Sequence, residues 1–376
     1  MKKKQLRRNE RNRVKALLSA ALLIPGLYIG SVSAQTAPSS PEVRIGYMEY
    51  RDAQKSDDRM RVHTPHAWFR LPGFGKSEVE GSLTFDSMSG ASPYFLSTLS
   101  GASGMGVDDQ RKAGDLKYTH YLDSFSVGLG GAISTENDYL SKTISGESRI
   151  WSDDKNTTFT IAGSLTGDDI SSRIDARVDE DRRTGSVLVG ITQVIDDKSL
   201  VQSNVSFSSG DGYYSDPYKP LDNRPRSREE WAWLTQYRRF LSDYDAALHL
   251  DYRLFADSWD VMAHNVSVAW YQNIGESWVI RPSIRYYTQS EASFFDSEVP
   301  PVDREKRFSA DQRLSDFGSV TAGIKLEYAM AKDLSVSVSA DVMHQRSGLA
   351  AFGHEATDIK PFNAAFGIVQ LIKRFP

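Results

Sequence analysis

The chain has 376 residues, of which 40% are hydrophobic and 25% are charged, with no cysteine and a formal net charge of -4. A helical membrane bundle needs repeated apolar runs of about 20 residues, and the sequence has only one shorter run near its beginning, so that class is excluded. The lack of cysteine excludes disulfide scaffolds, thiolate zinc sites, c-type haem attachment and lipid attachment at an N-terminal cysteine. Aromatic residues reach 11%, which excludes a disordered chain.

The N-terminus has the pattern of an export signal. Residues 2–15 carry eight basic side chains and one acidic side chain, and an apolar stretch follows over 16–30. Val32-Ser33-Ala34 supplies the small residues that a signal peptidase reads, so we expect residues 1–34 to be a cleavable signal peptide that is cut after Ala34. Residues 35–42 are then a short periplasmic segment.

A membrane anchor is the alternative reading, but the apolar run is short and contains Pro25 and Gly26. Removal of the signal peptide changes the formal net charge from -4 to -11. An acidic, exported protein is a poor partner for nucleic acid, and we expect none.

The mature chain is dominated by period-two alternation, which predicts strands with one apolar and one polar face. The clearest example is 334–342, where every even position is apolar. Most of the expected strands reach the roughly 9 to 11 residues that a tilted strand needs to cross a bilayer, whereas strands of soluble proteins centre on about 5 to 6. The sixteen expected strands are 43–52, 59–71, 76–87, 114–122, 125–134, 139–151, 156–167, 185–195, 200–210, 229–240, 246–256, 261–272, 278–290, 318–330, 334–345 and 362–375.

The connections between these strands differ in length on the two sides. Every second gap has at most five residues, while the intervening gaps include long ones at 88–113, 168–184, 211–228, 291–317 and 346–361. Tight periplasmic turns and long external loops are typical of outer-membrane barrels. The sequence therefore predicts an all-β, antiparallel, up-and-down transmembrane barrel over 43–376, with about 16 strands and 14 as the alternative, in a Gram-negative outer membrane.

A soluble, exported all-β protein is the competing class, but a sandwich has no reason to segregate its loop lengths. The polar face is also richer than a dry core tolerates, as shown by Arg281, Ser283 and Arg285. Pro65 and Pro282 fall inside expected strands and each lacks a ladder donor, so a bulge or a shortened strand is expected there. The last strand ends at Phe375, which is similar to the C-terminal signal read by the barrel-assembly machinery.

Several segments together resemble the bacterial family catalogued as domain of unknown function 3570. They are Asp86-Ser87-Met88-Ser89-Gly90-Ala91-Ser92-Pro93-Tyr94, Arg111-Lys112-Ala113-Gly114-Asp115, Glu136-Asn137-Asp138-Tyr139, Gly212-Tyr213-Tyr214-Ser215-Asp216-Pro217-Tyr218-Lys219, Tyr286-Tyr287-Thr288-Gln289-Ser290 and Ser309-Ala310-Asp311-Gln312-Arg313-Leu314-Ser315. The resemblance implies an outer-membrane barrel without an assigned activity. It also implies neighbouring genes for a thioredoxin-like protein, a small lipoprotein and a flavin transferase, hence a periplasmic redox or lipoprotein partner.

No linear motif for catalysis, metal or cofactor binding is present, so we expect no catalytic, metal or cofactor site. His63 and His66 are three apart in a strand, which places them on opposite faces. The acidic loop clusters lack a calcium-binding frame and contain interleaved arginines, so we expect solvated external loops that contact lipid and lipopolysaccharide.

The charges of the polar face give the candidate site. Parity predicts four cations in the lumen, Arg253, Arg281, Arg285 and Lys325, and four carboxylates, Glu78, Glu80, Asp86 and Asp341. Opposed charged walls would select permeants by charge, and a salt-bridged filling that closes the lumen is the equal alternative. Loops 88–113 and 291–317 are the expected plugs.

Three functions follow from these patterns. The first is a porin-like channel or conduit of unknown permeant. The second is a structural sleeve or assembly partner for a periplasmic redox or lipoprotein module. The third is an outer-membrane enzyme, whose site would be built from several strands and so would show no linear motif.

Overall fold

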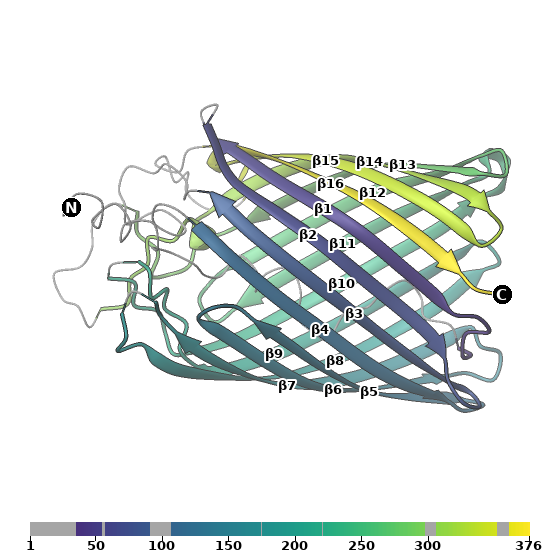
Figure 1. The fold of residues 1–376 in the computed structure, drawn as a ribbon, viewed down its shortest axis with the longest axis horizontal. Helices are drawn as coiled ribbons and strands as arrows, with labels where there is room; N and C mark the ends of the chain where they lie inside the picture. The colour runs from purple at the N-terminus through teal and green to yellow at the C-terminus, as the bar shows by residue number, and fades with distance from the viewer. Residues whose placement is uncertain are drawn as a thin grey trace, which may run out of the picture.

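The computed structural model describes residues 35–54, 57–90, 107–173, 175–219, 221–297, 306–351 and 361–376. Over these residues the chain forms sixteen antiparallel strands that close into a barrel (Figure 1). Each strand pairs with its neighbours in chain order, and β1 closes the ring by pairing with β16. The all-β, up-and-down barrel of sixteen strands is thereby confirmed over the alternative of fourteen.

The strands are β1 Glu42–Gln54, β2 Asp57–Pro72, β3 Ser77–Gly90, β4 Val107–Tyr121, β5 Phe125–Thr135, β6 Tyr139–Trp151, β7 Thr157–Ser171, β8 Asp179–Asp196, β9 Ser199–Gly212, β10 Ser227–Leu241, β11 Ala246–Asp257, β12 Met262–Ile274, β13 Trp278–Gln289, β14 Phe317–Ala331, β15 Leu334–Arg346 and β16 Phe362–Arg374. Three short 3₁₀ turns lie between strands: η2 Ser242–Tyr244, η3 Gln312–Leu314 and η4 Ser347–Leu349. In the described part of the chain, no helix has the length and apolar character needed to cross a membrane.

Two properties favour these strands. Closure of the ring gives every strand a hydrogen-bonded neighbour on each side, and the period-two pattern places apolar side chains on one face and polar side chains on the other. A closed barrel has no free sheet edge, and this is required in the hydrocarbon interior of a bilayer, where lipid cannot hydrogen-bond to the backbone. Large apolar side chains such as Leu129, Ile144 and Leu165 are more than 60% exposed. They form an apolar outer face, as a lipid-facing wall requires.

The two ends of the barrel differ as the loop lengths predict. The tight turns lie at the end that also holds the C-terminus (Figure 1), and Gly75 and Gly275 supply the positive φ that two of these turns need. Glu42 at the start of β1 pairs with Arg374 at the end of β16. The strand that opens the barrel and the strand that closes it therefore begin and end on the same side.

The strands at the other end are longer than alternation predicts. β3 continues to Gly90 and β4 begins at Val107 rather than at 114, so the expected loop 88–113 shrinks to 91–106, which lies outside the described residues. β8 likewise begins at Asp179 rather than at 185. The expected ends of these strands were wrong because their hydrogen-bonded ladders continue beyond the lipid into water. There both faces of a strand are polar, so the alternation of apolar and polar residues ends before the strand does.

The bulges expected at Pro65 and Pro282 are absent. Pro65 stays opposite Tyr47 of β1, and Pro282 stays opposite Ile324 of β14. The ladder is interrupted only toward the other neighbour, β3 or β12, and the register is the same on both sides of each interruption. A long strand that is hydrogen-bonded along one neighbour can lack one backbone donor toward its other neighbour without a change of register.

Three arginines on one carboxylate hold the closing seam. Glu42 has 5% exposure and accepts from Arg44 at 2.6 Å and from Arg374 at 3.1 Å, with Arg70 of β2 at 3.8 Å. The seam thus joins side chains from β16, β1 and β2. The expected signal peptide, 1–34, lies outside the described residues.

Candidate functional site

The inner face of the barrel is the polar one. Only on the concave side can side chains of strands that are not neighbours meet. Gln370 of β16 lies 3.4 Å from His66 of β2 across β1, and Arg182 of β8 donates to Tyr139 of β6 at 3.2 Å across β7. His63, by contrast, contacts the outward Tyr47, so the two histidines do lie on opposite faces.

Five of the predicted lumen residues lie on one side of the ring, in the inner rows of β11 and β13–β15. Lys325 lies 3.5 Å from Glu327. Asp341 interacts electrostatically with both Arg281 and Arg285. Arg253 is exposed and has no carboxylate within ion-pair distance among the described residues.

A glycine lets these charges approach across a strand. Gly323 of β14 sits between Ser283 of β13 and Asp341 of β15 in the register. A Cβ on Gly323 would collide with the Asp341 carboxylate and lie 2.9 Å from the Ser283 hydroxyl. Asp341 therefore occupies the space above Gly323 and leans toward the arginines of β13.

The other three predicted residues share β3. Asp86 accepts from Thr64 at 2.6 Å and from Arg111 at 2.6 Å. Glu78 accepts from the Tyr121 hydroxyl at 2.7 Å. Glu80 lies opposite Lys117 in the register, but Lys117 is 3.2 Å from Glu147, so Glu78 and Glu80 keep negative charge that no described cation neutralises by direct contact.

The ring places these two charged groups on opposite walls. β3 and β11 are eight strands apart in a ring of sixteen, whichever way the ring is followed. The carboxylates of β3 thus lie on the wall opposite Arg253, with Glu78 and Glu80 closer to the tight-turn end than Arg253 and Arg285. The role of these residues as the lining of an open pathway stays a prediction.

Between the charged walls runs a wall of small hydroxylic residues that sequence reasoning did not single out. Ser164, Ser186 and Ser208 form a lateral row across β7, β8 and β9. In the next row, the hydroxyls of Thr143 and Thr166 are 2.9 Å apart. The sequence did contain a signal for this wall, because these serine and threonine residues alternate with exposed apolar residues. Hydroxyl groups on one face of a strand that spans lipid are expected to point inward.

The long-loop end carries a folded cap, which we define as residues 213–226, 258–261 and 290–316, excluding 220 and 298–305. Asn223 and Phe308 exchange two backbone hydrogen bonds of 2.8 and 2.9 Å. These bonds join the loop after β9 to the loop after β13, although some 80 residues separate the two in the chain.

Ions buried inside the cap strengthen this junction. Asp311 is fully buried and forms ion pairs with Lys219 at 3.3 Å, Arg224 at 2.8 Å and Arg313. Among the described residues, the ion pairs of this network link three cations and three carboxylates: Lys219, Arg224, Arg313, Asp216, Asp222 and Asp311. Because buried charges are costly unless paired, this network fixes the two loops relative to each other.

Burial changes the acidity of these groups. Burial would raise the pKa of Asp311, but Arg313, Lys219 and Arg224 outweigh it and hold that pKa well below its usual range. For Asp216 burial prevails over the same kind of attraction and raises the pKa to about 6. Burial lowers the pKa of Lys219. Within the described part of the cap, the pKa of Asp216 is thus raised toward neutrality, while that of its neighbour Asp311 is lowered.

The cap lies over the lumen rather than beside it. Gln289, in the inner row of β13, donates to the backbone carbonyls of Arg313 at 3.0 Å and Ser315 at 2.7 Å. The guanidinium of Arg182, also on an inner row, lies 4.9 Å from the ring centre of Tyr214. Contacts with inner rows place both cap loops on the concave side.

A small apolar core supports the cap from below. Trp259 is buried with Val261, Ala292 and Leu314, and its ring packs edge-on against Tyr214 at 5.3 Å. The Arg228 guanidinium of β10 lies 4.3 Å from the Trp259 ring. A core of this kind makes the cap a folded unit with its own packing.

Segments that carry the family resemblance meet in and around this cap. Tyr218 of the cap donates to Asp138, while Asp86 and Arg111, from two other such segments, pair with each other between β3 and β4. Asp216 and Asp222 belong to an acidic loop cluster that was expected to be solvated, and that expectation was wrong because Arg313 and Arg224 pair with them inside the cap. Of the two expected plugs, the described part of 291–317 folds inward, whereas 91–106 lies outside the described residues.

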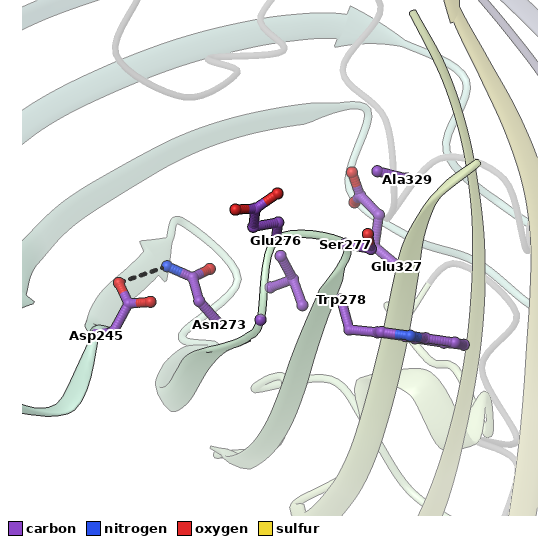
Figure 2. A pocket seen from close by; sticks show the side chains of 9 residues that line it. Asp245, Asn273, Glu276, Ser277, Trp278, Glu327 and Ala329 are labelled. Atoms are coloured by element: carbon purple, nitrogen blue, oxygen red, sulfur yellow. Dashed lines mark hydrogen bonds between the residues drawn. The ribbon is translucent and has the colours of Figure 1, made fainter. Parts of the chain in front are cut away.

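At the tight-turn end there is a shallow hollow of about 310 Å³ beside β11–β14. Figure 2 shows Asn273 donating to Asp245, at 2.9 Å, on one side of the hollow, with Glu276 and Glu327 on the other. Within the described ranges no group of three acidic or histidine side chains could hold a metal ion. With Asp245, Glu276 and Glu327 in its lining, the hollow is an acidic recess on one side of the tight-turn end.

Comparison with known proteins places the chain in an uncharacterised family. A family model described as "Protein of unknown function (DUF3570)" matches residues 96–180 and 171–365. No curated protein matches the chain.

Among solved structures, the chain is similar to a bacterial polysaccharide outer membrane secretin, at 9% identity and a TM-score of 0.51, with 90% of this chain and 99% of that one covered. It is also similar to CdiB from Acinetobacter baumannii, at 8% identity and a TM-score of 0.52, with 89% of this chain and 60% of that one covered. At such identities the likeness concerns the fold, which is that of outer-membrane barrels.

Proposed function

Because the chain belongs to the DUF3570 family, whose description assigns no activity, we propose its function from the barrel itself: a conduit for small hydrophilic solutes across the outer membrane. The observation that carries the proposal is the arrangement of the inner face. Glu78 and Glu80, which have no cation in direct contact among the described residues, lie on the wall opposite the exposed arginines of β11 and β13, which lie farther from the tight-turn end. Charged walls of opposite sign orient polar solutes and suit a wet passage.

The size of the barrel agrees with this proposal. Barrels of 16 to 18 strands leave an aqueous channel, whereas eight strands are filled by their own side chains. The cap is then a constriction at the external mouth. The barrel fold supports an outer-membrane location, and we propose that export uses residues 1–34, cut after Ala34. External contacts are lipid and lipopolysaccharide, and insertion uses the barrel-assembly machinery.

Conductance of the purified protein in planar lipid bilayers tests the conduit. We expect stepwise currents, and larger steps for Asp311→Asn, which removes the charge at the centre of the cap network. A barrel that passes no current as the wild type or as this variant contradicts the proposal. Copurification with a periplasmic redox protein or lipoprotein, without conductance, would favour the sleeve or assembly role instead.

A further inference from the structure

We propose that Arg253 and Arg285 form a binding site in the lumen for small oxyanions, meaning solutes that present a carboxylate or phosphate group. The inference deepens the conduit proposal by naming the class of solute, and it rests on that proposal because the site is reached through the lumen. Three observations carry it: an excess of positive charge, two exposed arginine residues, and short polar side chains between them.

The excess of charge follows from the ion pairs of this wall. Four cations, Arg253, Arg281, Arg285 and Lys325, share two carboxylates, Glu327 and Asp341. Asp251 lies on the inner row of β11 beside Arg253 and is 2.5 Å from Arg238. Farther along the same rows, Glu230 and Asp257 both pair with Arg228. With these pairs counted, six cations meet five carboxylates, so the wall keeps an excess of about one positive charge, and Arg253 is the cation without a carboxylate in direct contact among the described residues.

The register places the two arginines around one short-chained strand. Arg253 of β11 lies beside Asn265 of β12, and Arg285 of β13 lies beside Ser267 of β12. The row of Arg285 and Ser267 continues to Asp251, so Arg253 and Arg285 lie one row apart and their Cα atoms are about 12 Å from each other. Both residues are exposed. Two arginine side chains can converge over Asn265 and Ser267 on a group of carboxylate or phosphate size.

Other groups of this wall favour an oxyanion over a simple halide. A guanidinium presents paired donors that match two oxygens of a carboxylate or phosphate. Asn265 adds an amide donor between the two arginines, while the Ser267 hydroxyl donates to Asp251 at 3.4 Å. Tyr287, next to Asn265 in the register, has its hydroxyl bonded to Gln289 at 2.7 Å, which links this wall to the residue that holds the cap.

Competition between chloride and inorganic phosphate tests the site. With chloride as the current carrier in planar bilayers, added phosphate should reduce the current and the reduction should saturate. Arg253→Gln and Arg285→Gln should each raise the half-inhibiting phosphate concentration about tenfold, the loss typical of one charge-assisted hydrogen bond. The double variant should lose saturable inhibition.

Arg111→Gln is the matched control, because it removes the same charge from the inner row of β4 on the opposite side of the ring. It should keep the phosphate inhibition of the wild type. The inference is overturned if the double variant remains as sensitive as the wild type, or if Arg111→Gln loses inhibition equally. Heat-modifiable electrophoretic mobility establishes that each variant has folded.

A direct binding measurement separates this inference from the conduit proposal. Phosphate binding to the protein in detergent micelles, measured by isothermal titration calorimetry, needs no current. Binding that disappears in the double variant supports the site even if the barrel proves silent. Absence of binding to a conducting wild type overturns the site and leaves the conduit standing.

Discussion

At the scale of single residues, Gly323 sets how the charges of β13–β15 reach one another. Alanine there would push the Asp341 carboxylate aside, and Arg281 and Arg285 would lose their shared counter-charge. We expect Gly323→Ala to increase the permeability of anions relative to cations, measured as the reversal potential in a potassium chloride gradient. The change in stability should stay within about 1 kcal/mol, because only the end of a side chain must move.

Gly131→Ala is the control for this prediction. A Cβ on Gly131 meets nothing closer than a backbone carbonyl at 3.7 Å, so its reversal potential should equal that of the wild type. An unchanged reversal potential in Gly323→Ala would show that Asp341 does not govern the field of this wall.

Glu42 holds the seam by the same kind of local charge balance. Glu42→Gln keeps the size of the side chain but weakens its bonds to Arg44 and Arg374, and leaves Arg70 without this carboxylate. Loss of charge-assisted hydrogen bonds should cost about 1 to 2 kcal/mol. The urea concentration at the unfolding midpoint should fall, and Glu276→Gln, on an exposed turn, should leave it unchanged. Equal midpoints for both variants would contradict the role of Glu42.

At the scale of elements, strands were predictable and loops were not, for one physical reason. Inside the lipid, every side chain of a strand must suit one of two solvents, so alternation reveals both the strand and its inner face. Beyond the lipid this constraint ends, which is why β3, β4 and β8 extend past their expected bounds. The inner rows of Arg253 and Glu80 follow from parity, whereas the pairing of Asp311 with Lys219 depends on two loops meeting in space.

The buried ion network should hold the cap together independently of the barrel. Asp311→Asn leaves Lys219, Arg224 and Arg313 buried with too little negative charge, and breaking one partner of a buried ion network is strongly destabilising. The barrel should remain folded while the cap loosens. We expect larger single-channel conductance and faster proteolysis within 306–316. Asp175→Asn, which breaks only an exposed pair with Arg177, should change neither quantity.

At the scale of the whole molecule, the buried network couples the opening of the barrel to pH. Arg313, Lys219, Arg224 and Asp311 all face Asp216. With the cap closed, burial raises the pKa of Asp216 to about 6, whereas with the cap open this carboxyl returns toward its ordinary value of 3.8. The closed state therefore binds a proton more tightly, so acid favours closure.

The pH dependence of conductance follows from this sign. Between pH 7 and pH 5 the closed state gains a proton that the open state does not, which should lower the ratio of open to closed barrels about tenfold. Asp216→Asn is neutral at both pH values, and we expect it to conduct equally at both, below the level of the wild type at pH 5. The role of Asp216 would be contradicted by currents that increase on acidification, or by an Asp216→Asn variant that keeps the full pH dependence. The dependence requires Asp216 to lie inside a closed cap, so Asp311→Asn, which loosens the cap, should abolish it as well.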